Sequence, residues 1–227
     1  AQAVQPLGRA DFQSHRPHPP IFQRRRMAPV GEQDVVETKR RDEGLLAKYN
    51  GLLRDHPLAT KAISGGLINF SAEFLGQLIR AARNTGPKQR PAERLLRLAS
   101  FAIWGSGGAA PLFHWWFGNL ETLANSSQVL ARMGNTAKVI YKVVIHQVLF
   151  GPSFLIANLL ALNLLQTWSP SVAWGNVKAA YFNALPTMIR IFTPVQVANL
   201  SVVPLEYRVL MTNVAGFVWN LYVSLST

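Results

Sequence analysis

Residues 194–224 read PVQVANLSVVPLEYRVLMTNVAGFVWNLYVS, and this stretch decides the fold class. Its polar residues are single and widely spaced among Val, Leu, Phe and Met, whereas a soluble helix gathers them on one broad face. Arg208 precedes a run that carries no further charge up to Thr227. An arginine at the bilayer centre costs about 2.5–3.5 kcal/mol on insertion scales. Arg208 therefore needs an interface or a partner, and Glu206 or a helix-end carbonyl lies within reach.

Long apolar runs recur upstream of this stretch. Three runs contain no charged residue: 98–120, 143–177 and 209–227. A helix needs about 20 residues to cross a hydrocarbon core about 30 Å thick. The second run is long enough for one span over 143–165 and an uncharged connection, and the segment 57–79 is apolar apart from Lys61 and Glu73. The sequence therefore predicts an all-α integral membrane protein with four transmembrane helices, and a soluble helical bundle is the alternative.

The remaining segments are expected to be irregular. Residues 1–44 are predicted to form an extended, basic, proline-rich arm, and residues 45–227 the four-helix membrane domain. With few apolar side chains to bury, the arm cannot offset its own ordering entropy, so we expect it to bind other protein subunits. Residues 166–195 contain three prolines and are predicted to be a connection with a short interfacial helix. Because the chain does not begin with Met, we expect Ala1 to follow a removed targeting sequence.

The net charge of +12 points to anionic partners. Residues 57–227 hold thirteen Lys and Arg against four acids, and Arg80 and Arg83 lie in a basic cluster between the first two spans. We expect these arginines to contact anionic lipid headgroups, cardiolipin among them. The same contact, or one to a partner's acids, is expected of three arm residues: Arg24, Arg25 and Arg26. Nucleic acid is the weaker alternative, because no aromatic stacking module accompanies these arginines.

Small residues mark where the first two spans should pack. Close helix approach in lipid uses small residues at i and i+4, a spacing that Gly105 and Ala109 provide in the second span. The first span offers Gly65 and Gly66. We expect the two backbones to approach each other at these four residues.

Isolated polar residues within the apolar segments are the candidate functional groups. A carboxylate such as Glu73 must be neutralised, paired or hydrated, and Arg97 or Arg208 from another helix could pair with it. His146 and Gln147 are expected to form interhelical hydrogen bonds, with a proton or ion relay as the alternative.

Catalytic and metal chemistry have little support in this sequence. None of the five histidines pairs with another at i and i+4, cysteine is absent, and the few acids after residue 57 are spread over different segments. Paired carboxylates, a nucleophile elbow or a nucleotide fingerprint would be needed for an enzyme. We therefore expect no catalytic, metal-binding or cofactor-binding residues and no enzymatic activity.

The motifs taken together resemble the Mpv17/PMP22 family. The resemblance covers about residue 45 to the C-terminus and includes His56-Pro57-Leu58, Ala110-Pro111 and His114-Trp115-Trp116-Phe117. It also includes polar positions in the predicted spans: Glu73, Gln77, Arg97, His146, Gln147, Gln196, Asn199 and Arg208. His146 stands where the family usually has Asp.

The resemblance implies a multi-pass protein of the mitochondrial inner membrane, or else of the peroxisomal membrane. Two functions follow. The first is a non-catalytic accessory subunit of a larger inner-membrane complex, such as a respiratory complex or ATP synthase, which the predicted arm favours. The second is a small channel or metabolite conduit. A conduit should bring Glu73, Gln77, His146 and Gln147 to one hydrated cavity, whereas we expect paired polar groups.

Overall fold

The computed structural model describes residues 44–84 and 89–226, and every regular element in these residues is helical. The chain divides after Leu45 into two units, and the helical bundle belongs to the second. Residues 1–43, which include Arg24, Arg25 and Arg26 of the predicted arm, lie outside the described residues. The all-α class is confirmed, and the number of membrane spans stays a prediction.

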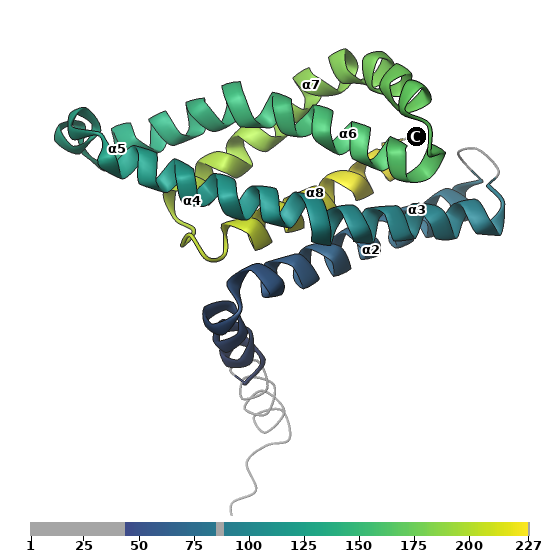
Figure 1. Ribbon diagram of the computed structural model, residues 1–227, viewed down its shortest axis with the longest axis horizontal. Coiled ribbons are helices and arrows are strands. Elements are labelled where there is room, and N and C mark those ends of the chain that lie inside the picture. Colours follow the sequence, from purple (N-terminus) through teal and green to yellow (C-terminus); the bar gives the residue numbers. More distant parts are fainter. Residues whose placement is uncertain (1–43, 85–88, 227) are drawn as a thin grey trace, which may run out of the picture. The chain divides into compact units, whose positions relative to one another are not determined.

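The first half of the bundle is a hairpin of two helical rods. A helical segment over 44–55 leads into α2 (Pro57–Arg83), which is followed by α3 (Pro91–Ile103), the π-helical segment η1 (Trp104–Ala109) and α4 (Ala110–Ser126). α3, η1 and α4 are continuous and form one rod (Figure 1). Both α2 and α3 start with proline, whose missing N–H is not needed in a first turn. α2 ends at Asn84 in a left-handed conformation with φ 52°, which asparagine tolerates.

The second half contributes three long helical segments. α5 (Gln128–Ile145) kinks at Gly134, whose φ of 85° is not helical. After the kink it continues through the π-helical segment η2 (His146–Phe150) and α6 (Gly151–Thr167) as one rod. α7 (Pro170–Ser201) returns along α5 and α6, and α8 (Arg208–Ser226) packs mainly against α2 (Figure 1). The described part of the bundle therefore has five long helical segments.

Both π-helical segments are explained by a proline that follows them. Each is followed by a proline two residues later, Pro111 after η1 and Pro152 after η2. A proline cannot donate to the carbonyl four residues earlier, and its ring presses against that carbonyl. The preceding turn widens in response, so the Ala110 N–H donates to the carbonyl of Gly105, five residues back. Each of these two helical rods therefore contains one extra residue in a turn near its middle, which rotates the residues after the turn relative to those before it.

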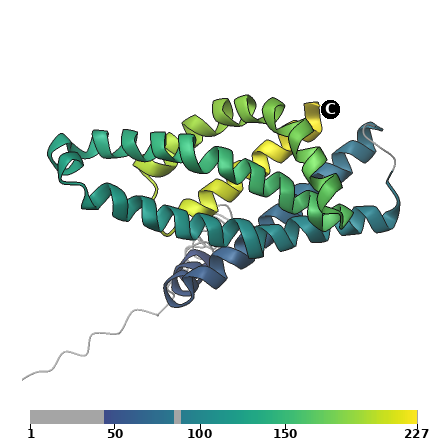
Figure 2. The ribbon, with the colours of Figure 1, turned by 45° about the horizontal axis from the view of Figure 1, so that its top comes forward.

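The structure corrects the interpretation of residues 166–195. These residues were expected to be a proline-broken connection, but α7 continues through Pro186 and Pro194 to Ser201. Each internal proline removes one backbone hydrogen bond, and α7 bends instead of ending (Figure 2). Such bends are tolerated where packed neighbours re-satisfy the freed backbone groups.

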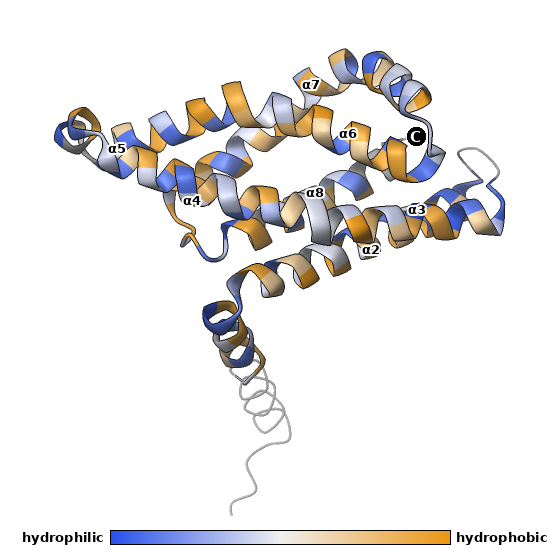
Figure 3. Ribbon diagram, viewed as in Figure 1, coloured by the Kyte–Doolittle hydropathy of each residue, from blue (hydrophilic) through white to orange (hydrophobic). Residues whose placement is uncertain are grey.

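The surface of α2 shows an apolar face turned outward. Ile63, Leu67, Phe74 and Leu78 are each about half or more exposed, with values of 64%, 63%, 47% and 50%. The buried residues of α2 are mostly small or polar: Thr60, Lys61, Gly65, Gly66, Ala72, Glu73 and Gly76. Hydrophilic residues gather instead at the α2–α3 and α4–α5 turns (Figure 3). This inside-out pattern is what a lipid-facing helix requires.

One segment of the bundle meets the requirements for a membrane span by length and composition alone. Within the described residues this segment is Arg132–Thr167, which runs through α5, η2 and α6. The shared apolar interior is centred on α4, with contributions from η1, η2, α7 and α8. Phe117, Leu120, Leu200 and Val209 are each at most 1% exposed there.

The predicted glycine contact between α2 and η1 is confirmed. A methyl group added to Gly105 would lie 2.7 Å from the Gly65 carbonyl oxygen, and one on Gly66 would lie 3.1 Å from the Ser106 Cβ. Ala110 takes the place predicted for Ala109, because the wide π-turn adds one residue to the repeat. Its Cβ would lie 3.2 Å from a methyl group added to Gly65. Ala109 is buried beside the interior cavity.

A cavity between two ion-pair clusters

The first ion-pair cluster joins α2 and α3 at the end of the bundle that carries the α2–α3 turn. Glu73 is 5% exposed and accepts from Arg97 Nε at 2.9 Å and from Arg80 Nη2 at 3.0 Å. Gln77 donates to the same carboxylate at 3.1 Å and also to the Arg94 carbonyl. We call these residues the Glu73 cluster. Of the two expected partners of Glu73, Arg97 and Arg208, the structure shows Arg97. Arg80, which was expected to contact lipid headgroups, forms an ion pair with Glu73.

The second cluster joins α4, α5 and α8 at the opposite end. The Glu121 carboxylate accepts from Arg208 Nη1 at 2.6 Å and from Lys142 Nζ at 3.0 Å. Arg208 also donates to the Val203 carbonyl at 3.1 Å. Val203 lies in the connection after α7, so the carbonyl is not the expected helix-end one, and the carboxylate partner is Glu121 instead of the expected Glu206. We call Glu121, Lys142 and Arg208 the Glu121 cluster.

Electrostatics keep the carboxyl of this second cluster ionised. Glu121 directly follows the charge-free run 98–120, at the end of the predicted span. Partial burial would raise the pKa of its carboxyl, but the hydrogen bonds and charges of Arg208 and Lys142 hold that pKa at about 2.

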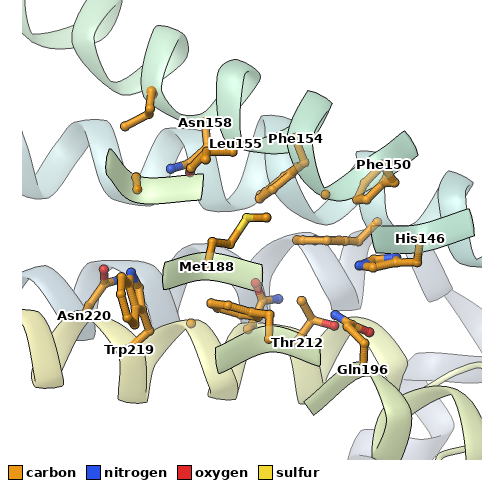
Figure 4. Close-up of a pocket in the computed structure, with 18 of the residues that line it drawn as sticks. His146, Phe150, Phe154, Leu155, Asn158, Met188, Gln196, Thr212, Trp219 and Asn220 are labelled. Carbon is orange, nitrogen blue, oxygen red and sulfur yellow. The ribbon is translucent and has the colours of Figure 1, made fainter. Parts of the chain in front are cut away.

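A cavity of about 300 Å³ lies in the bundle between the two clusters. All five long helical segments line it, and Asn158 and Phe154 of α6 face Met188 and Trp219 across it (Figure 4). Its polar lining consists of Asn69, His146, Gln147, Asn158, Gln196, Thr212, Asn213 and Asn220. Its aromatic lining consists of Trp104, Phe113, Phe150, Phe154, Phe192 and Trp219. The cavity thus combines hydrogen-bonding groups with flat apolar walls.

His146 and Gln147 border the cavity and also form the predicted interhelical bonds. The indole N–H of Trp116 in α4 donates to His146 Nδ1 at 2.9 Å. Gln147 donates to the hydroxyl of Thr193 in α7. Because an indole N–H is only a donor, His146 Nδ1 carries no proton while this bond exists. The imidazole is therefore neutral.

A buried polar network closes the cavity toward the Glu121 cluster. Asn199 is 0% exposed, and its Nδ2 lies 3.2 Å from Gln196 Oε1 and 3.0 Å from Thr212 Oγ1. The same nitrogen lies 3.2 Å from the Arg208 carbonyl. Gln196, Asn199 and Arg208, three separate predictions from the sequence, are thus brought together at one end of the cavity.

Four asparagines line the cavity but were not predicted as site residues from the sequence: Asn69, Asn158, Asn213 and Asn220. Each is an amide in a mostly apolar stretch of helix, which is the signal that could have identified it. Asn158 accepts from Trp104 Nε1 at 2.7 Å, and the Trp104 ring lies over Gly108, where an added methyl would clash at 2.2 Å. The glycine-rich π-turn therefore makes room for an indole that reaches across to α6.

The structure separates the polar residues that a simple conduit was expected to unite. His146 and Gln147 line the cavity, whereas Glu73 and Gln77 belong to the Glu73 cluster. Within residues 44–84 and 89–226, no three His, Cys, Asp or Glu side chains gather as a metal ion would require. The chemistry available in the cavity is therefore hydrogen bonding and aromatic contact.

Comparisons with known proteins give the chain its relatives. Residues 163–224 match the sequence profile of the Mpv17 / PMP22 family. The chain is 33% identical to Mitochondrial inner membrane protein Mpv17 of Caenorhabditis elegans over 175 residues, which cover 77% of this chain and 88% of the relative. It is 29% identical to Peroxisomal membrane protein 2 of Bos taurus over 184 residues, covering 79% and 87%. No solved structure matches the chain.

Proposed function

Because this chain belongs to the Mpv17/PMP22 family, we propose that its helical bundle is a conduit for small polar solutes across an organelle membrane. The protein is a membrane protein of the mitochondrial inner membrane, with the peroxisomal membrane as the alternative that the names of its relatives also support. In this proposal the chain is non-catalytic and transports solutes without a bound cofactor.

The cavity is the observation that carries the proposal, although Glu73 and Gln77, which a conduit was expected to place there, lie in the Glu73 cluster instead. Its volume of about 300 Å³ is at the lower limit for ligand sites, and amide, hydroxyl and imidazole groups line it alongside aromatic rings. A purely structural bundle in lipid would bring its buried amides together in pairs, because unpaired polar groups are costly there. Here Asn213 Nδ2 is buried without a partner among the described residues. Water or a polar solute in the cavity would satisfy such a group.

The conduit requires the closed end of the cavity to open. Gln196, Asn199 and Thr212 separate the cavity from the Glu121 cluster, so solute passage needs this network to rearrange. α7 carries two of these residues and bends at Pro186 and Pro194. A proline bend is a place where a helix can change direction without losing further hydrogen bonds. We propose that α7 moves to open this end.

Solute release from vesicles that contain the purified chain tests the proposal. Gly216 borders the cavity, and an added Cβ there meets no atom within 4 Å, so Gly216→Leu should fill the cavity without clashing. Gly175→Leu on the exposed part of α7 is the matched control, since its added Cβ also meets nothing. Release by the wild type and by Gly175→Leu, but not by Gly216→Leu, is the expected result.

The accessory subunit remains the rival proposal. It is favoured by the composition of the predicted arm, which would bind other subunits, and by the basic residues that would bind anionic lipid. In that case the vesicles release no solute, and the chain from native membranes migrates in a stoichiometric complex of constant size. Rapid release from vesicles that contain only this chain would contradict it.

A further inference from the structure

A second hollow, an apolar groove of about 210 Å³, lies between α2 and α8. Five residues line it: Leu67, Ile68, Ser71, Val214 and Phe217. Leu67 is 63% exposed and Val214 is 46% exposed, so the groove opens to the outside of the bundle. We propose that it holds one acyl chain of an anionic phospholipid whose phosphate lies against Arg83. The site is independent of the proposed conduit, because its lining shares no residue with the central cavity.

One ridge of α2 leads from the groove to the basic end of the helix. Residues four apart are neighbours on a helix surface. Such a row is formed by Leu67, Ser71, Leu75, Ile79 and Arg83. None of these five side chains is buried. The row therefore begins in the groove, is apolar apart from Ser71 along its length, and ends at an exposed cation.

The length of this ridge matches one leaflet of a membrane. Ser71 and Arg83 are 12 residues apart, which is about 18 Å along α2 at about 1.5 Å per residue. The hydrocarbon of one leaflet is about 15 Å thick, half of the core. Hydrophilic residues gather at the α2–α3 turn, as expected of a segment at headgroup level (Figure 3). A lipid with its phosphate at Arg83 therefore reaches the groove with the end of one acyl chain.

The charge at this end of the bundle favours an anionic lipid as the occupant. Residues 80–97 hold six Lys and Arg against a single acid, Glu93. Even with Glu73, which binds Arg80 and Arg97, the positive charges remain in excess. A phosphate supplies the missing negative charge. A second copy of the chain in the same orientation would bring the same positive excess to the groove and would be repelled.

Lipid binding by the purified full chain tests the proposal. Native mass spectrometry compares dioleoyl phosphatidylglycerol with dioleoyl phosphatidylcholine, which have the same acyl chains and differ in net charge. Phosphatidylglycerol should bind about tenfold more tightly. Equal affinities would overturn the assignment of an anionic lipid. Glycerol phosphate, which has the phosphate but no acyl chain, should not compete at the same concentration. Displacement of the lipid by it would overturn the role of the groove.

A substitution at the basic end tests the headgroup contact. Arg83→Gln should weaken the binding of phosphatidylglycerol about fivefold and leave that of phosphatidylcholine unchanged. Arg132→Gln is the matched control, because it removes an equally exposed class of cation near the start of α5, away from the groove. An equal effect of both substitutions would mean that only the net charge matters, and would overturn the contact with Arg83.

A substitution in the groove tests the acyl-chain contact. Ser71→Trp should fill the groove and weaken the binding of both lipids about tenfold, since the indole displaces about two methylene groups. Ser153→Trp on the exposed surface of α6 is the matched control and should leave both affinities unchanged. Unchanged lipid binding by Ser71→Trp would overturn the proposal. A change from dimer to monomer in this variant would also overturn it, because a second copy would then occupy the groove.

Discussion

The ion-pair clusters at the two ends of the bundle have the same charges but differ in which charge is buried. Each has one carboxylate bound to two cations. In the Glu73 cluster the acid is 5% exposed, while the side chains of Arg80 and Arg97 are 24% and 31% exposed. In the Glu121 cluster the acid is 27% exposed, while those of Lys142 and Arg208 are each only 8% exposed. One end buries the anion and the other buries the cations.

This difference determines which carboxylate the fold depends on. Loss of a buried acid leaves partly exposed arginines that water can reach, whereas loss of a partly exposed acid leaves two buried cations without a counter-charge. The Glu121 cluster also joins helices far apart in sequence, since Glu121 and Arg208 are 87 residues apart. The Glu73 cluster joins consecutive helices. The more exposed acid should therefore be the more important one.

The comparison assumes that the two ends face opposite sides of the membrane. α7 would then cross the membrane, since Ser171 and Ser201 are about 45 Å apart along its 32 residues. The chain has no cysteine, so a single introduced thiol gives an unambiguous label. In oriented vesicles, an impermeant maleimide should modify Ser126→Cys and Ser201→Cys from one side and Ser171→Cys from the other. This is an all-or-none effect.

The alternative topology gives a different labelling result. If residues 166–195 lie along one surface, as the sequence interpretation has it, Ser171→Cys and Ser201→Cys react from the same side. Four spans would then be correct, and the two clusters would have to be placed anew. Labelling after the vesicles are opened is the control, because all three thiols should then react.

Removal of the exposed acid should give the largest loss of stability. Glu121→Gln leaves Lys142 and Arg208 buried without a carboxylate, and breaking a buried pair in this way costs about 3–5 kcal/mol. The free energy of unfolding of the purified protein in detergent measures this loss. A loss below about 1 kcal/mol, as for a surface ion pair, would mean that water reaches both cations.

Acid should reproduce part of this loss in the wild type. The pKa of the Glu121 carboxyl falls from 4.5 to about 2 in the fold, so its contribution to stability is present above about pH 4.5. That contribution is lost as the pH falls from 4.5 toward 2. Because Gln does not titrate, unfolding of Glu121→Gln should lack this component.

Removal of the buried acid should cost less. Glu73→Gln keeps an acceptor oxygen for Arg97 or Gln77 and replaces the charged acceptor by a neutral amide oxygen, a loss of about 1–2 kcal/mol. Arg80 and Arg97 stay in contact with water because of their exposure. Unfolding under the same conditions as for Glu121→Gln ranks the two ends. A larger loss for Glu73→Gln would reverse the comparison.

Much of this arrangement could be predicted from local pattern. The charge-free runs give the helical segments, and Gly65 and Gly105 meet because only small residues allow backbones that close. The cost of an unpaired carboxylate in an apolar helix predicts that Glu73 has a partner, and the structure chooses Arg97 over the alternative Arg208. Each of these inferences depends on one or two neighbouring helices.

The remaining features depend on tertiary context. Proline in a helix interior normally breaks or kinks it, but α7, which packs against α5, α6 and α8, continues through Pro186 and Pro194. Ala110, and not Ala109, takes the predicted contact with Gly65, because Pro111 induces a π-turn. The i and i+4 spacing used for the prediction assumes a regular α-helix. The cavity unites amides from helices that are distant in sequence. No single-helix pattern predicts that Asn69 and Asn220 line the same space.

The smallest effect is expected from a buried cation of the Glu121 cluster. In Lys142→Met, Glu121 still binds Arg208, and the methionine retains an unbranched apolar stem in place of an ammonium group that is costly to bury. The unfolding free energy should therefore change by no more than about 1 kcal/mol. Combined with Glu121→Gln, the same substitution should recover part of the loss, because one buried unpaired charge then replaces two. If Lys142→Met alone lowers the free energy of unfolding as much as Glu121→Gln does, the stability that the Glu121 cluster provides depends on the number of its ion pairs and not on the burial of its cations.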